Sequence, residues 1–132
     1  MVLSSSPNQP LVGSSFAVID VRGVLLVSIP ASLSDGEVRR MRSVLGDRLQ
    51  RAAWRGLVLD ASAVDTLDSF MSRSLRDLAV GARLMGVATV VCGLRPDVVD
   101  ALVEMGLDLP GVTTRTNLDQ ALQMFDGRRS RR

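Results

Sequence analysis

Apolar residues follow two patterns along this chain, short continuous runs and longer stretches in which they recur every three or four positions. The short runs are typical of strands, and the run 57–59 is apolar throughout, as in strands that are covered on both faces. The first two runs are separated only by Arg22 and Gly23, which predicts a β-hairpin. We predict five strands in all: 16–21, 24–29, 57–59, 87–92 and 112–115.

The longer stretches predict four amphipathic helices. The first begins with Ser34 and Glu37, which have the spacing of a capping box. The predicted core positions include Met85 in the second helix, and Val99 and Val103 in the third. The four predicted helices run from Ser34 to a stop at Gly56, from near Asp68 to Gly86, from Pro96 to Gly106, and from a second capping box, Asn117 and Gln120, to about Phe125.

The predicted order of elements is β-β-α-β-α-β-α-β-α. A hairpin that leads into strand–helix units predicts an α/β fold, with a mixed sheet of about five strands covered by about four helices. The 132 residues are the size of one domain. We expect a flexible leader at 1–14, the folded domain at 15–126, and a disordered Arg-rich tail at 127–132.

Charge is distributed unevenly and argues against a nucleic-acid partner. All sixteen basic residues are Arg, four of them lie in the last five positions, and the fourteen acidic residues lie between Asp20 and Asp126. The folded part is therefore mildly acidic, whereas nucleic-acid binding requires a basic surface on the fold. No apolar run approaches the roughly 18 residues that cross a bilayer, and the chain starts without a signal-peptide pattern. With a single Cys92 and no disulfide, we expect a cytoplasmic protein without membrane contact.

The residue types that most enzymes need are absent. The chain has no His and no Lys, which removes the commonest general base, the commonest metal ligand and the lysine of a phosphate-binding loop. We therefore expect no enzyme activity, no cofactor and no metal. One alternative remains open: Asp60, Asp65 and Asp68 follow the third predicted strand and could hold Mg²⁺ or a nucleotide, although loop aspartates more often bind backbone amides. For Cys92, at the end of an apolar strand, a core position is favoured over a nucleophile.

Two consecutive segments resemble the signature of STAS domains, the anti-sigma-factor antagonist family: Gly56-Leu57-Val58-Leu59-Asp60 and Val64-Asp65-Thr66-Leu67-Asp68-Ser69-Phe70. In that family a strand ends in Asp, a short loop follows, and an Asp-Ser or Asp-Thr pair opens the next helix. The resemblance extends over about residues 16–126. Four further segments resemble the stressosome scaffold subgroup, which comprises RsbS-type proteins and the STAS half of RsbR-type proteins: 25–29, 82–86, 92–96 and 102–106.

The resemblance implies a phosphorylation-controlled scaffold or antagonist. Ser69 is then the residue that an RsbT-like serine kinase phosphorylates, and Asp65, Asp68, Ser69 and Phe70 form the partner-binding surface. It also implies RsbR-like STAS proteins as partners in a homo- or hetero-oligomer. No glycine directly follows Ser69, and we expect no large sensory domain before the STAS segment; both points favour the RsbS type.

Two other interpretations remain beside this one. Spacing alone makes Ser69 an ordinary helix-capping neighbour, and only the resemblance makes it a regulatory site. The chain could also be a stand-alone anti-anti-sigma factor that binds an anti-sigma kinase directly. That class, however, often has a Gly-rich turn after the phosphorylated serine, where this chain has Phe70-Met71-Ser72.

Overall fold

The computed structural model describes residues 16–104 and 112–129, and these form a mixed five-stranded sheet. The spatial order of the strands is their chain order. β1 and β2 form the predicted antiparallel hairpin, with Arg22 at φ 52° and Gly23 at φ 86° in its turn, and every later pair is parallel. The strands are β1 (Ala17–Val21), β2 (Val24–Ser28), β3 (Gly56–Asp60), β4 (Thr89–Cys92) and β5 (Thr113–Arg115).

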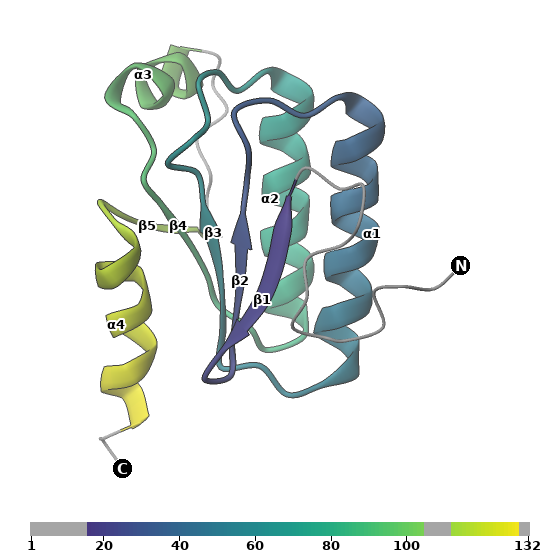
Figure 1. Ribbon diagram of the computed structural model, residues 1–132, viewed down its shortest axis with the longest axis vertical. Coiled ribbons are helices and arrows are strands. Elements are labelled where there is room, and N and C mark those ends of the chain that lie inside the picture. The colour runs from purple at the N-terminus through teal and green to yellow at the C-terminus, as the bar shows by residue number, and fades with distance from the viewer. Residues whose placement is uncertain (1–15, 105–111, 130–132) are drawn as a thin grey trace.

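Helices cover both faces of the sheet, as the α/β prediction requires (Figure 1). α1 and α2 lie side by side on one face, α4 lies on the other, and α3 lies beyond the edge at which the parallel strands end. The helices are α1 (Asp35–Arg51), α2 (Ser69–Leu84), α3 (Pro96–Glu104) and α4 (Leu118–Arg129). No helix in the described parts of the chain is long and apolar enough to span a membrane.

The sheet separates two apolar clusters, because successive side chains of a strand point to opposite faces. Leu57 and Leu59 of β3 belong to the larger cluster, which α1 and α2 cover. Val58 of the same strand belongs to the smaller cluster, with Phe125 of α4. The prediction that the apolar run 57–59 forms a strand covered on both faces is therefore confirmed.

Helix α1 ends at Arg51, so the prediction that it continues to Gly56 was wrong. Beyond it, the indole N–H of Trp54 donates to the carbonyl of Arg48, which satisfies one acceptor near the helix end. Gly56 instead begins β3. A Cβ atom at Gly56 would overlap the ring of Phe125, so the glycine is needed for the close approach of α4 to the sheet.

The other residues that were predicted to begin or end a helix agree with the structure only in part. Gly86 comes directly after Met85, the C-cap of α2, and its φ of 83° is the left-handed conformation common just beyond a helix end. At the start of α4 the Asn117 side chain accepts from the Gln120 amide at 2.9 Å, but the Gln120 side chain accepts from the amide of Thr116, so the predicted box is only half formed. α4 extends to Arg129, three residues into the segment 127–132 that was predicted to be disordered. Gly106, the leader 1–14 and residues 130–132 lie outside the described residues.

Candidate functional site at the start of helix α2

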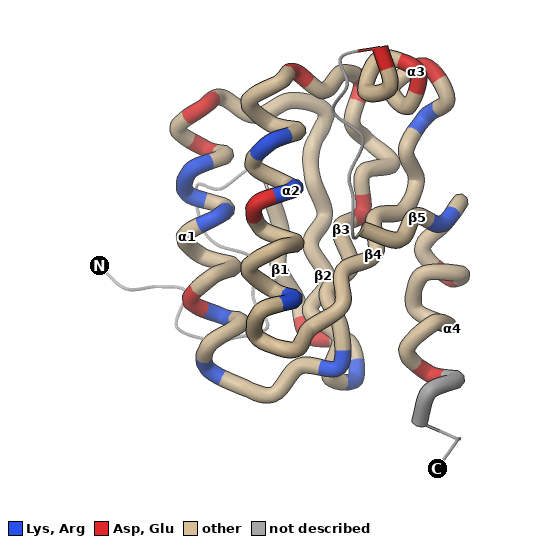
Figure 2. Tube along the Cα trace, turned by 180° about the vertical axis from the view of Figure 1, so that it is seen from behind, with Lys and Arg blue, Asp and Glu red and all other residues tan. Residues whose placement is uncertain are grey.

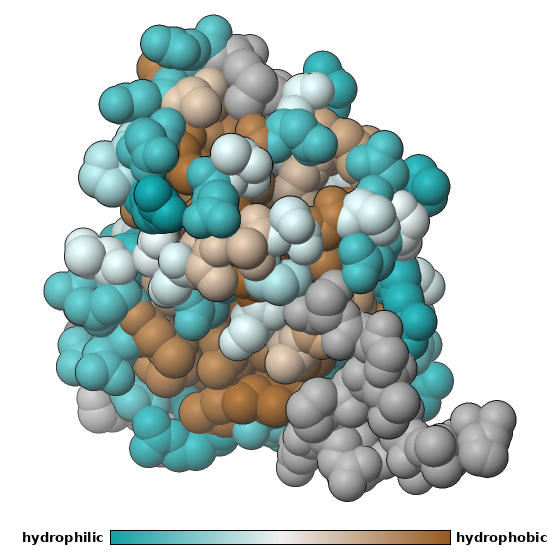
Figure 3. Space-filling view, turned by 45° about the horizontal axis from the view of Figure 1, so that its top comes forward, coloured by the Kyte–Doolittle hydropathy of each residue, from teal (hydrophilic) through white to brown (hydrophobic). Residues whose placement is uncertain are grey.

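The loop between β3 and α2 lies at the edge where the parallel strands end, and buried anchors hold it in place. The amide of Ala61 donates to the Cys92 carbonyl of β4 at 2.8 Å. Val64 and Leu67 are buried in the larger cluster, while Asp65 between them is exposed. Figure 3 views the molecule with this edge turned forward, and the surface there is largely hydrophilic with apolar residues visible between the polar ones. The loop therefore presents polar side chains from a fixed backbone.

Ser69 is the first residue of α2, and Asp68 is its N-cap, as the sequence predicted. The Asp68 carboxylate accepts from the amide of Met71 at 2.7 Å, and the Ser72 hydroxyl donates to the Asp68 carbonyl at 2.9 Å. Asp68 is exposed and Ser69 is half-buried. Because Ser69 occupies the first turn, its backbone amide has no acceptor within the helix. The serine hydroxyl thus lies at the positive end of the helix dipole.

Phe70 is partly buried rather than freely exposed. Its ring packs against the larger apolar cluster, and the guanidinium of Arg39 in α1 lies over it at 5.8 Å from the ring centre. This is the range of a cation–π contact. Phe70 therefore links the start of α2 to α1, and only one part of its surface is open to a partner.

Asp65 forms an ion pair that the sequence did not reveal. Its carboxylate accepts from the Arg95 guanidinium at 3.0 Å, and Arg95 also lies 3.6 Å from the carboxylate of Asp97. Arg95 is thirty positions away in the loop between β4 and α3, so only the parallel pairing of β3 with β4 brings it to Asp65. The pair connects the loop before α2 to the start of α3.

Asp60, Asp65 and Asp68 do not converge on one point. The Asp60 carboxylate accepts from the amide and the hydroxyl of Ser62, at 3.0 and 2.6 Å, while Asp65 binds Arg95 and Asp68 caps α2. No group of three acidic or thiol side chains suited to a metal ion occurs among the described residues. The described residues therefore give no support to a Mg²⁺ site built on these three aspartates.

Two further residues shape this edge: Cys92, the last residue of β4, and Gly93, which follows it. Cys92 is fully buried, which confirms the predicted core position. Burial and, second, the nearby Asp60 carboxylate raise the pKa of its thiol to about 11, so it stays protonated at neutral pH and is not an activated nucleophile. Gly93 follows with φ 81°, and a Cβ atom there would overlap Ser62. Gly93 thus allows the two loops to approach closely.

Comparison with known proteins identifies the family from almost the whole of this fold. Residues 15–121 match the STAS domain. The chain belongs to the STAS domain family. The resemblance seen in the sequence is therefore confirmed, and so is the predicted fold of five strands and four helices.

Relatives place the chain near the RsbS and RsbR types within this family. The RsbT co-antagonist protein RsbRB of Bacillus subtilis is 31% identical over 93 residues, which cover 68% of this chain and 34% of that protein. The match thus spans about a third of the length of this relative. The uncharacterized protein YezB of Bacillus subtilis is 37% identical over 67 residues, or 51% of this chain and 68% of YezB.

Two solved structures agree with this placement. RsbS of Moorella thermoacetica, in a form with a serine-to-glutamate substitution, is 32% identical with a TM-score of 0.79, and the match covers 89% of this chain and 99% of RsbS. A structure described as the molecular architecture of the stressosome, a signal integration and transduction hub, is 34% identical with a TM-score of 0.76, covering 87% and 99% of the two chains. This STAS protein is thus an RsbS-like member of the anti-sigma antagonists.

Proposed function

We propose that this STAS protein is a phosphorylation-controlled scaffold and antagonist of a partner-switching stress-response pathway. It binds an RsbT-like serine kinase through Asp65, Asp68, Ser69 and Phe70, and the kinase phosphorylates Ser69. The protein itself catalyses no reaction. It assembles with RsbR-like STAS proteins, as the names of its relatives suggest.

The position of Ser69 carries this proposal. It is the first residue of α2, at the edge of the sheet and next to the exposed carboxylate of Asp68. Val64 and Leu67 anchor the loop before α2, so a kinase meets a fixed backbone around the half-buried Ser69. The other two serines of α2 are buried: Ser72 and Ser74.

Phosphorylation of Ser69 adds negative charge to the start of α2 but requires no change of fold. A phosphoserine carries about −1.5 to −2 charges at pH 7. The dipole of α2 favours that charge by about 0.3–1 kcal/mol, and the carboxylates of Asp65 and Asp68 oppose it. The main consequence is therefore a more negative surface, and like charge across an interface costs several kcal/mol. Release of a bound partner follows from this change.

Kinase-dependent phosphorylation tests the proposal directly. The purified chain is incubated with its cognate RsbT-like kinase and Mg²⁺-ATP, and its intact mass and modified residue are determined. We expect one phosphate, on Ser69, and none in Ser69→Ala. Ser62→Ala is the matched control, since Ser62 is an exposed serine of the loop that precedes α2, and this variant should accept phosphate like the unchanged protein.

Either of two results would overturn the phosphorylation switch. One is the absence of phosphate under conditions in which the kinase modifies another STAS substrate. The other is a phosphate that persists in Ser69→Ala. If Ser69 is phosphorylated but no assembly with RsbR-like proteins is seen by sedimentation, the chain is a stand-alone antagonist rather than a scaffold.

A further inference from the structure

Large exposed apolar side chains occur in only two places among the described residues. Val80, Leu84 and Met85 lie at the C-terminal end of α2, and Val99 and Val103 lie on α3. The predictions that Met85, Val99 and Val103 belong to the core were therefore wrong. Clustered apolar surface of this kind marks interaction sites more often than isolated exposed residues do.

The first place is a convex ridge on α2, formed by Arg76, Val80, Arg83 and Leu84 and called here the α2 ridge. Val80 is 49% exposed and Leu84 is 83% exposed, and their spacing of four places them one turn apart on one side of the helix. α2 carries three Arg and a single Asp. That Asp77 carboxylate is 3.8 Å from the guanidinium of Arg42 in α1, so the ridge has a net positive charge.

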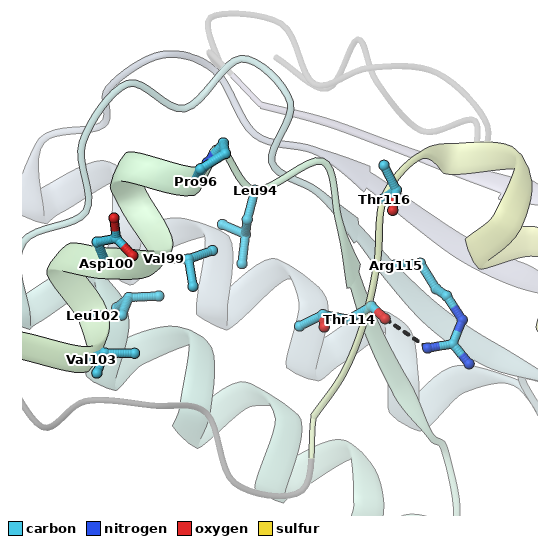
Figure 4. A pocket seen from close by; sticks show the side chains of 9 residues that line it. All are labelled: Leu94, Pro96, Val99, Asp100, Leu102, Val103, Thr114, Arg115 and Thr116. Atoms are coloured by element: carbon cyan, nitrogen blue, oxygen red, sulfur yellow. Dashed lines mark hydrogen bonds between the residues drawn. The ribbon is translucent and has the colours of Figure 1, made fainter.

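The second place is a hollow of about 640 Å³ between α3 and β5, called here the α3–β5 groove. In Figure 4, Val99, Leu102 and Val103 of α3 point toward Thr114 of β5 across this hollow, while the side chain of Arg115 points away from it. Val103 is 65% exposed. The groove therefore has apolar walls that nothing in the described part of the chain covers.

The α3 wall of the groove is acidic, opposite in charge to the ridge, while Arg115 lines the groove from β5. α3 carries Asp97, Asp100 and Glu104 and no basic residue. Asp97 lies near Arg95, but neither Asp100 nor Glu104 takes part in an ion pair within the described residues. Figure 2 shows the contrast, with acidic positions on α3 and mainly basic ones along α1 and α2.

We propose that the α2 ridge of one copy docks into the α3–β5 groove of a second copy of this chain. The convex apolar surface of Val80 and Leu84 fits the concave apolar surface of Val99 and Val103, and Arg76 and Arg83 face Asp100 and Glu104. Complementary potentials of this kind fix the register of two partners and speed their association. This proposal rests on the part of the proposed function that concerns assembly, and it names the surfaces that make the contact. It does not depend on phosphorylation of Ser69.

The two surfaces differ, so the contact is head-to-tail. After the ridge of one copy has docked into the groove of another, the first copy still has a free groove and the second a free ridge. Contacts of this class close into rings or extend into larger assemblies, depending on the rotation between neighbours. Screening by salt weakens the charge component, so association should decrease as ionic strength rises.

Sedimentation velocity of the full chain, from micromolar to near-millimolar concentration, tests the proposal. We expect the unchanged protein to form species heavier than its 14.2 kDa monomer as concentration rises. Leu84→Asp in the ridge and Val103→Asp in the groove should each weaken this self-association about tenfold or more, because each places an unpaired carboxylate in the contact. Gln123→Asp, the same charge change at an exposed position of α4, should leave it unchanged.

Mixing the two defective variants gives the sharper result. Leu84→Asp retains an intact groove and Val103→Asp retains an intact ridge, so together they should form a 1:1 dimer and nothing larger. A symmetric contact or an unrelated surface would not give this pattern. A monomeric unchanged protein, an unaffected single variant or a mixture that stays monomeric would each overturn the proposal.

Two controls separate this result from misfolding and from the kinase hypothesis. Thermal unfolding followed by circular dichroism should show that both variants remain folded, since the two replaced side chains are exposed. Both should accept phosphate on Ser69 as the unchanged protein does. Loss of assembly with normal phosphorylation supports the docking surface, whereas failed phosphorylation of the unchanged protein contradicts only the switch.

Discussion

Helices α1 and α2 begin at the same edge of the sheet, but their first turns differ in charge. At α1 the Ser34 hydroxyl accepts from the Glu37 amide at 3.2 Å, and the Glu37 carboxylate accepts from the Ser34 amide at 2.9 Å. Asp35, the first residue of the helix, adds a second acidic side chain. At α2 the cap is the carboxylate of Asp68 alone, and the first turn contains no acidic residue.

The two helix starts differ in their caps, in Glu37 of α1, and in the first residue after the cap. That first residue is Asp35 in α1 and Ser69 in α2. At this first helical position α1 thus carries permanently a negative charge that α2 acquires only when Ser69 is phosphorylated, although α2 already has the Asp68 carboxylate at its cap. Since α1 accommodates this charge at the corresponding place, phosphorylation of α2 can act as a change of surface charge rather than a refolding event.

The largest expected effect concerns the kinase. Ser69→Asp makes the start of α2 resemble that of α1 and should weaken binding of an RsbT-like kinase more than about tenfold, because a desolvated like charge costs several kcal/mol. Titration calorimetry measures the affinity. Ser32→Asp adds the same charge to the neighbouring exposed loop and should have a much smaller effect. Equal affinity of Ser69→Asp and the unchanged protein would contradict the role assigned to this charge.

A smaller effect is expected on stability when the cap of α2 is removed. Asp68→Ala deletes the acceptor for the Met71 amide, and loss of such a cap costs about 0.5–2 kcal/mol in the free energy of unfolding. Urea denaturation measures the difference. Asp68→Asn keeps a capping oxygen and should recover most of it. If the alanine and asparagine variants were equally stable, Asp68 would not stabilise the helix as a cap.

The helix starts were predictable because caps are local. The spacing of Ser34 and Glu37 and the placement of Asp68 before an apolar stretch lie within a single turn of chain. The same holds for the order of strands and helices along the chain, since each apolar run is continuous and each strand–helix unit is short. These signals predicted the sheet and located Ser69 at the start of α2.

Contacts between distant segments were not predictable in this way. Arg95 reaches Asp65 only because two parallel strands end side by side, and Gly56 is required by the ring of Phe125 far along the chain. Periodicity also assigned Val99 and Val103 to the core. α3 has only nine residues and contacts the core through Val98 and Leu102, so its other apolar positions remain exposed.

The smallest expected effect compares the two helix starts directly. Asp35→Ser removes one of the two first-turn charges of α1 and leaves Glu37, and Ser69→Asp adds one charge to α2. By the helix-dipole interaction, the first should lower and the second should raise the free energy of unfolding, each by about 0.3–1 kcal/mol in low salt. The increase at α2 should lie near the bottom of that range, because Asp68 and Asp65 repel the new carboxylate.

Urea denaturation at two salt concentrations distinguishes this electrostatic effect from a packing effect. Screening should shrink both shifts as salt rises, whereas lost packing would be unaffected. Should Ser69→Asp instead destabilise the protein by as much as Asp68→Ala, the start of α2 would not tolerate negative charge. Phosphorylation would then have to loosen the first turn of α2, and kinase release would follow from local unfolding rather than from repulsion across an intact surface.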